Sequence, residues 1–391
     1  MNSEERFKCS FIRFGAAICL AVFFLIALLS PLWAQAKGDW KQTWETVLRE
    51  AKKEGKVVVF GPPGEVVRKA IVEGFTQAFP DIRIEYSGAR GSDHVAKIRA
   101  ERDAGIYSVD VFNGNNLVAN FNLRPIGALD PLRPALILPE VADLKHWHDG
   151  RLEFSDSAAL HHLVFTSTIF PLLMYNLQQV KPEEIAGPND LLNPKWKGRI
   201  VINDPLLPSA AYVIFQWLWR VLGPEKATDY YRKIRAQAGA VDRDYRRQIE
   251  WVAQGKYAML LGPSSLMYQL AKRGLSFGVI PEFKNLGAYV SDSFGGVSLM
   301  NRAPHPNAAK VFINWLLGKE GQTAWSKAME QVSRRADVPS DHVPSYMAPK
   351  PSARYWVSDY KAGDRYWVSY AENTSKRTKE EEKILEELFG R

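Results

Sequence analysis

The stretch Lys56-Val57-Val58-Val59-Phe60-Gly61-Pro62-Pro63-Gly64 sets a pattern that the chain repeats. A short β-branched run is typical of a buried strand, and the glycines and prolines that follow it end the strand in a turn. Apolar side chains then recur at helical spacing as far as Pro80, at Val66, Val67, Ala70, Ile71, Phe75 and Phe79. The stretch therefore predicts a strand, a loop and a helix in succession.

The same succession recurs further along the chain. Ile82, Ile84 and Tyr86 alternate with charged residues as in a half-buried strand, and Ser92 or Asp93 can cap a helix that runs to about Ala104. Similar patterns predict strands at 109–112, 200–202, 257–261 and 276–280, and helices at 211–221, 225–236, 246–253, 307–317 and 318–329. Strands that alternate with helices are typical of an α/β fold whose sheets are mostly parallel.

The composition is that of a folded protein with more than one domain. The chain has 391 residues and a net charge of +8, with 46% hydrophobic and 24% charged residues. These values exclude a disordered or collagen-like chain, and the length suggests two or three domains. Basic residues are spread along the chain rather than gathered in runs with aromatic residues, so we expect no nucleic-acid partner.

Residues 1–36 have the pattern of an export signal. Basic residues precede an uncharged apolar segment at 14–29, and Ala34-Gln35-Ala36 supplies a cleavage site that predicts a cut after Ala36. The alternative is an uncleaved membrane anchor, because the uncharged stretch extends to Ala36. Both cysteines, Cys9 and Cys19, lie in this segment, so the cleaved chain would have no thiol chemistry. We expect a periplasmic body in a Gram-negative-type envelope, without stable membrane insertion of the mature chain.

Catalytic motifs are absent from the sequence or incomplete. There is no phosphate-binding loop with its lysine and no Gly-x-Ser-x-Gly nucleophile turn. His146 and His148 could begin a zinc or copper site, but no third ligand follows at a motif spacing, and we interpret them as part of a polar surface loop. We expect no enzyme activity, no cofactor and no metal site. A secreted hydrolase built on Ser264 or on the two histidines is the alternative from another functional class.

Polar, glycine-rich loops follow several of the predicted strands. In open α/β sheets ligands bind at the carboxyl ends of the strands, beside helix N-termini whose free N–H groups favour anions. Each such residue can instead serve only as a turn or a helix cap, and it is the number of these loops that favours a ligand cleft. The candidate ligand-binding residues are Pro62, Gly64, Arg90, Gly91, Ser92, Asn113, Asn203, Asp204, Ser209 and Ser264.

Several segments, taken in order, resemble one protein family. They are Tyr86-Ser87-Gly88 with Arg90-Gly91-Ser92, then 100–105, Val109-Asp110-Val111, Asn203-Asp204-Pro205, 252–258, 303–310 and 335–338. Together they resemble the extracellular solute-binding proteins of ABC importers, in the type II group that includes ferric-ion and thiamine binders. The resemblance covers nearly all of the chain after the export signal. Its motifs are specific for the family rather than for a ligand.

The resemblance implies two α/β lobes joined by two crossing strands, with the ligand in a cleft between them. Lobe one would comprise 37–165 plus 284–391 and lobe two 166–283. The outward crossing would lie within 165–176 and the return near 277–283. Hinge closure around a small solute would signal an ABC importer permease and its cytoplasmic ATPase. The same resemblance implies a monomer.

The resemblance leaves the solute open. Ferric binders of the group carry adjacent tyrosines after the segment that corresponds to 255–258, whereas here Tyr268 stands alone, which weighs against iron. Arg90 and Arg243 favour a small anion, whereas Asp204 and Asp292 could face a cation such as thiamine. We therefore predict a periplasmic receptor for a small anionic organic solute. Ferric-ion or thiamine-type binding is the alternative in the same transport role.

The C-terminal part of the chain contains a repeat and an amphipathic segment. Arg354-Tyr355-Trp356-Val357-Ser358 recurs at 365–369, and on a helix the two copies would face the same side. We interpret the repeat as an aromatic stripe that holds the tail to the body. Apolar residues at 384, 385, 388 and 389 predict a terminal surface helix.

Overall fold

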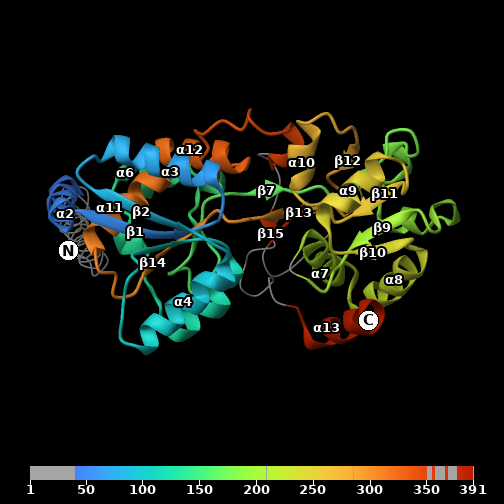
Figure 1. Cartoon of the computed structure of the whole chain (residues 1–391), viewed down its shortest axis with the longest axis horizontal. Coiled ribbons are helices and arrows are strands. Elements are labelled where there is room, and N and C mark those ends of the chain that lie inside the picture. The colour runs from blue at the N-terminus through green and yellow to red at the C-terminus, as the bar shows by residue number, and fades with distance from the viewer. Residues whose placement is uncertain are drawn as a thin grey trace, which may run out of the picture.

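Two α/β lobes flank a small central group of strands in a computed structural model of the chain (Figure 1). The structure describes residues 40–207, 209–284, 286–349, 355–356, 366–368 and 377–390. The predicted export signal at 1–36 lies outside the described residues.

The sheet of lobe one grows outward from the strand quoted at the start of the sequence analysis. β1 (Lys56–Gly61) pairs in parallel with β2 (Arg83–Gly88) on one side and β3 (Val111–Asn113) on the other. The chain returns to this sheet much later with β14 (Gly296–Met300), which runs antiparallel to β3. The sheet is completed by β4 (Leu129–Asp130), β5 (Glu153–Phe154) and β6 (Leu163–Val164). Distant parts of the sequence therefore share one sheet.

Helices cover both faces of this sheet, with α3 and α12 on one side and α4 on the other (Figure 1). The Phe75 ring meets the rings of Phe312 and Trp315 edge to face, with centroids 5.4 and 5.5 Å apart, and joins early and late helices in one core. The helices of lobe one are α2 (Trp40–Glu54), α3 (Glu65–Ala78), α4 (Gly91–Asp103), α5 (Asn116–Val118), α6 (Pro139–Ala142), α11 (Pro306–Leu317) and α12 (Lys319–Met329).

The predicted cap of α4 at Ser92 or Asp93 is wrong. The helix begins at Gly91, and Arg90 is its N-cap without a side-chain hydrogen bond. A Cβ atom at position 91 would collide with the Val118 side chain, so the glycine lets the start of α4 approach α5. Close packing, rather than a polar cap, therefore fixes where this helix begins.

Lobe two has its own mixed sheet. β9 (Ile200–Asn203) is parallel to both β10 (Ala240–Asp242) and β11 (Met259–Leu261), while β8 (Leu173–Tyr175) runs antiparallel to β11 and β12 (Gly278–Ile280). The core beside this sheet is aromatic, with Trp196, Trp217 and Tyr231 fully buried. The helices are α7 (Ala210–Leu222), α8 (Pro224–Gln237), α9 (Tyr245–Ala253) and α10 (Leu266–Ala271).

A third, small sheet lies between the lobes. β7 (Thr168–Ile169) is antiparallel to β13 (Ala288–Ser291), and β7 lies within the predicted outward crossing. The predicted return near 277–283 is wrong, because β12 pairs with β8 inside the sheet of lobe two and β13 is the strand beside β7. An apolar run cannot by itself reveal whether a strand completes a sheet or leaves it. The residue boundaries predicted for the two lobes stay a prediction.

The described parts of the repeat are strands rather than a helix. β15 (Tyr355–Trp356) pairs in parallel with β16 (Tyr366–Val368), and β16 pairs in parallel with β13. The register joins Tyr355 to Tyr366, so equivalent residues of the two copies are partners. The helical expectation fails because β13 offers a free strand edge to residues that favour strands.

The terminal helix α13 (Lys379–Phe389) forms as predicted, but it packs on α8 of lobe two (Figure 1). The Phe389 ring meets Phe215 of α7 with ring centroids 5.3 Å apart, and the Arg235 Nε–H of α8 donates to the Leu388 carbonyl at 3.2 Å. The helix therefore packs on lobe two, although it falls within 284–391, the range predicted for lobe one. An apolar helix face indicates that a helix docks, but not on which lobe.

Replacing Phe389 by alanine tests the docking of α13. The side chain is 6% exposed, so we expect Phe389→Ala to lower the free energy of unfolding by about 3 kcal/mol. Lys383→Ala, at an exposed position of the same helix, should change it by less than about 0.5 kcal/mol. Chemical denaturation measures both values, and equal effects would contradict the packing described here.

Candidate functional site

A cavity of about 430 Å³ lies where the two lobes and the central strands meet. Lobe one contributes its α5 segment, lobe two contributes the starts of α7 and α9 and the loop after β11, and the central part contributes the end of β13. The lining consists of Asn115, Asn116, Leu117, Phe170, Ser209, Ala210, Tyr212, Val213, Gln216, Tyr245, Pro263, Ser264, Ser265, Tyr289, Ser291, Asp292, Ser293 and Phe294.

Three buried polar atoms, carried by residues of both lobes that line this cavity, have no hydrogen-bond partner among the described residues. They are Asn116 Nδ2 in lobe one and Gln216 Nε2 and Ser264 Oγ in lobe two. The Asn116 and Gln216 side chains are 4% and 1% exposed. A buried polar group without a partner costs about 1–3 kcal/mol, so a cluster of them on one cavity points to a guest that completes their hydrogen bonds.

The first two turns of α7 build one wall of the cavity. Ser209 caps the helix by accepting the Tyr212 N–H at 3.1 Å, and its hydroxyl donates to the Asp204 carbonyl at 3.3 Å. Residues 212 and 213 lie three or four positions after 209 and before 216, which puts all four on one face of the helix. These residues and Ala210 line the cavity, so the start of the helix borders it.

Asp292 supplies the carboxyl group of the cavity. Its Oδ2 accepts the Asn116 N–H at 3.0 Å, and its carbonyl accepts the Thr166 hydroxyl at 2.8 Å. Burial raises the pKa of the Asp292 carboxyl to about 7, although the Asn116 N–H lowers it in part. Among the described residues the lining contains no lysine or arginine that would oppose this shift. With a pKa of about 7, the acid is divided between its protonated and ionised forms at neutral pH.

The predicted ligand-binding residues divide into three groups. Ser209, Ser264 and Asp292 line the cavity. Pro62, Gly91 and Asn113 line a narrow crevice that shares Asn115 and Phe294 with it. Gly64, Arg90, Ser92, Asn203, Asp204 and Arg243 lie outside both linings.

The residues of the third group that have partners serve local structure. The Arg243 Nε–H donates to Asp204 Oδ2 at 2.7 Å, and Asp204 Oδ1 accepts the Leu206 N–H at 2.9 Å. Asn203 Nδ2 donates to Gln248 Oε1 at 3.2 Å. These contacts shape the turn that leads from β9 to α7, the helix that forms one wall of the cavity.

Sequence reasoning missed most of the lining. Asn116, Gln216, Tyr212, Tyr245 and Tyr289 follow no motif that marks a ligand site. One signal was present, because Gln216 is an amide within the otherwise apolar run 213–219. A polar residue on the buried face of a helix needs a partner, and the described residues offer none to Gln216 Nε2.

The sequence alternatives find little support at this cavity. The lining contains no histidine that could activate Ser264. His146 Nδ1 instead lies 3.7 Å from Asp337 Oδ2, and Tyr268 lies outside the lining, where its hydroxyl accepts a hydrogen bond from the Tyr346 hydroxyl at 3.1 Å. Among the described residues, no group of three or more histidine, cysteine, aspartate or glutamate side chains could hold a metal ion.

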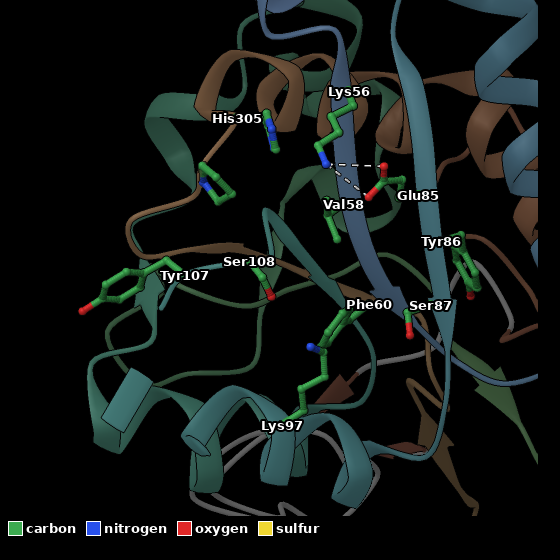
Figure 2. A pocket seen from close by; sticks show the side chains of 11 residues that line it. Lys56, Val58, Phe60, Glu85, Tyr86, Ser87, Lys97, Tyr107, Ser108 and His305 are labelled. Atoms are coloured by element: carbon green, nitrogen blue, oxygen red, sulfur yellow. Dashed lines mark hydrogen bonds and ion pairs between the residues drawn. The ribbon is translucent and has the colours of Figure 1, made fainter. Parts of the chain in front are cut away.

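A second hollow of about 540 Å³ lies on lobe one alone (Figure 2). Its rim includes Lys56, whose ammonium group lies 3.4 Å from the Glu85 carboxylate, and His305, whose Nδ1 lies 2.9 Å from Asp110 Oδ2. These charged groups already have partners within the same lobe. The cavity between the lobes is therefore the better candidate for a ligand site.

The sequence profile of the bacterial extracellular solute-binding proteins matches residues 70–350, which is more than half of the chain. The chain belongs to this family. A relative from Haemophilus influenzae is 22% identical over 279 residues, which cover 71% of this chain and 77% of the relative. As a solute-binding protein, the chain is a member of a family of binding proteins rather than enzymes.

Solved structures of similar fold include a ferric ion-binding protein and a periplasmic binding protein with a sugar phosphate bound. The apo ferric ion-binding protein A of Pasteurella haemolytica has a TM-score of 0.63 and 14% identity, over 85% of this chain and 98% of that one. The periplasmic binding protein AfuA of Actinobacillus pleuropneumoniae, with fructose 6-phosphate bound, has a TM-score of 0.53 and 20% identity, over 75% and 92%.

These neighbours confirm the predicted type II periplasmic-binding-protein fold, and the profile match confirms the predicted family of solute-binding proteins. The family places it in the bacterial periplasm. Within the described ranges, no helix has the length and apolar character needed to cross a membrane.

The raised pKa of Asp292 makes stability depend on pH. Between about pH 4 and 7 the folded state keeps a proton that the unfolded state, with a pKa of 3.8, has lost. The free energy of unfolding therefore falls as the pH rises through this window. Asp292→Asn keeps an acceptor for the Asn116 N–H and removes the titration. We expect this variant to be more stable at pH 7, by up to roughly 4 kcal/mol, with a flatter profile. Denaturation at several pH values measures this, and an unchanged slope would contradict it.

Proposed function

We propose that the protein is a periplasmic receptor that captures a small, oxygen-rich organic solute between its lobes and delivers it to an ABC importer permease with its cytoplasmic ATPase. The observation that carries the proposal is the convergence of Asn116, Gln216 and Ser264, each with a buried polar atom that lacks a partner, on one cavity between two lobes. Membership of the solute-binding family supports the transport role.

The lining favours a solute that offers hydrogen-bond acceptors. The amide N–H groups of Asn116 and Gln216 and the free N–H groups at the start of α7 are all donors. Hydroxyl, carbonyl or carboxylate oxygens on the solute would satisfy them. The sequence analysis predicts a negatively charged solute, with Arg90 and Arg243 as its counter-charges, but both arginines lie outside the lining. The N–H donors of the cavity would have to stabilise that charge instead.

Capture would proceed by closure of the lobes over the solute. A solute shifts such an equilibrium only through contacts that differ between the open and closed states. Asn116 lies in lobe one and Gln216 in lobe two, so one solute molecule could bond to both only when the lobes hold it between them. The permease would then recognise the closed form.

Analysis of undialysed protein purified from its native host identifies the solute. We expect mass spectrometry of the released small molecules to find one oxygen-rich organic compound in near-stoichiometric amount. After exposure to ferric citrate and desalting, we expect an iron-to-protein ratio near zero. Burial raises the pKa values of the cavity phenols Tyr212, Tyr245 and Tyr289, so few anionic ligands are ready for Fe(III). An iron-to-protein ratio near one would contradict the proposal of an organic solute and support ferric-ion binding.

Gln216→Leu separates binding from stability. Loss of an amide that has no partner should leave the free energy of unfolding of the empty protein unchanged or raise it. The same change should weaken binding of the identified solute about tenfold or more, because a solute acceptor loses its donor. Calorimetric titration and thermal denaturation measure the two effects.

Gln237→Leu is the matched control. Gln237 is also a buried helical glutamine, but its Nε2 donates to the Asn193 carbonyl at 2.6 Å and it lies outside the cavity. This variant should lose stability and keep its affinity. If Gln216→Leu behaves in the same way, the assignment of the cavity is wrong.

A further inference from the structure

Arg377 is buried behind the wall of the cavity. The residue is 6% exposed. Its guanidinium group donates one hydrogen bond to the Pro205 carbonyl through Nη1 and another to the Tyr212 carbonyl through Nη2, both at 2.8 Å. The same group stacks on the Tyr212 ring at 3.7 Å from its centroid. One side chain therefore holds both the turn before α7 and the first turn of the helix.

These contacts fall on the part of lobe two that forms the cavity. Tyr212 is a lining residue, and Pro205 belongs to the turn that leads to the cap residue Ser209. The loop that carries Ser264 packs on the first turn of α7, because a Cβ atom at Gly262 would collide with Ala211. A shift of the first turn of α7 would therefore displace polar groups on two sides of the cavity.

The helix that follows Arg377 anchors it in place. Arg377 Nε lies 3.3 Å from Oε1 of Glu381, which is fully buried, and the Thr378 hydroxyl caps α13 by accepting the Glu381 N–H at 3.1 Å. Phe389 then fixes the far end of α13 against α7. The family match ends at residue 350, so this anchor lies beyond the matched region.

We propose that Arg377 is a positioning residue of the solute cavity, which fixes Tyr212 and the start of α7 in the geometry that binds solute. It does not line the cavity itself and acts through the backbone and ring that it holds. The identity of the cavity as the solute site rests on the proposed function, whereas the positioning role can be tested without any solute.

The test compares Arg377→Met and Arg377→Lys in the full chain. Hydrogen exchange of the 210–216 amides reports the order of the first turns of α7. Each variant also carries Ser264→Cys, and the rate at which N-ethylmaleimide labels position 264, read by peptide mass spectrometry, reports access to the cavity. We expect Arg377→Met to speed both by about tenfold, since hydrogen bonds from a charged donor are lost. Lysine keeps the charge without the planar fork, so its effects should be smaller.

Arg235→Met is the matched control. Arg235 also bonds to α13, at the Leu388 carbonyl, and its guanidinium carbon lies 5.9 Å from the Phe389 ring centroid, but it is not among the lining residues. It should leave exchange at 210–216 and labelling at 264 unchanged. Equal effects of the two methionine variants, or an Arg377→Met protein that only melts earlier, would overturn the proposal. If Arg377→Met does not fold, the same two measurements on Arg377→Lys and Arg235→Met test the proposal. A receptor that binds no organic solute would refute the proposed function and leave these readouts intact.

Discussion

The antiparallel pairing of β7 with β13 is the constraint on which the rest of the structure depends. These short strands lie between two separate sheets, and Asp292 follows directly after β13. The carboxylate of Asp292 holds the start of α5 in lobe one through the Asn116 N–H, while Tyr289 of β13 packs in the aromatic core of lobe two. Contacts made by one short strand pair therefore position walls of the cavity in both lobes.

The polar groups of the cavity lower the stability of the empty protein. Asn116, Gln216 and Ser264 hold buried polar atoms without partners, and Asp292 keeps its acid away from water. Each of these features destabilises a folded chain unless another molecule completes it. The large aromatic core around Trp217, and the packing of early helices on α11 and α12 in lobe one, supply the stability that such a site requires.

Much of the fold could be predicted from the sequence because its signals are local. The run Lys56 to Phe60, the helix that ends before Pro80 and the Ser209 cap depend on residues a few positions apart. The position of a strand such as 278–280 within a sheet, or of α13 on lobe two, depends on contacts with distant residues that no local pattern carries. The site divides in the same way. The rule for loops after strands found Ser209 and Ser264. It also selected Asp204, which bonds to Arg243 instead of lining the cavity, and it missed Gln216, whose side-chain Nε2 has no hydrogen-bond partner among the described residues.

The docking of α13 on lobe two has a consequence for how the molecule can be observed. The described chain begins with α2 on lobe one and ends with α13 on lobe two, so its two ends lie on opposite bodies (Figure 1). Any relative motion of the lobes changes the separation of those ends. Both described ends carry exposed residues, and both native cysteines lie outside the described ranges. A donor and an acceptor dye placed on the two helices would therefore convert lobe motion into a fluorescence signal, which makes the receptor a ready scaffold for a solute sensor.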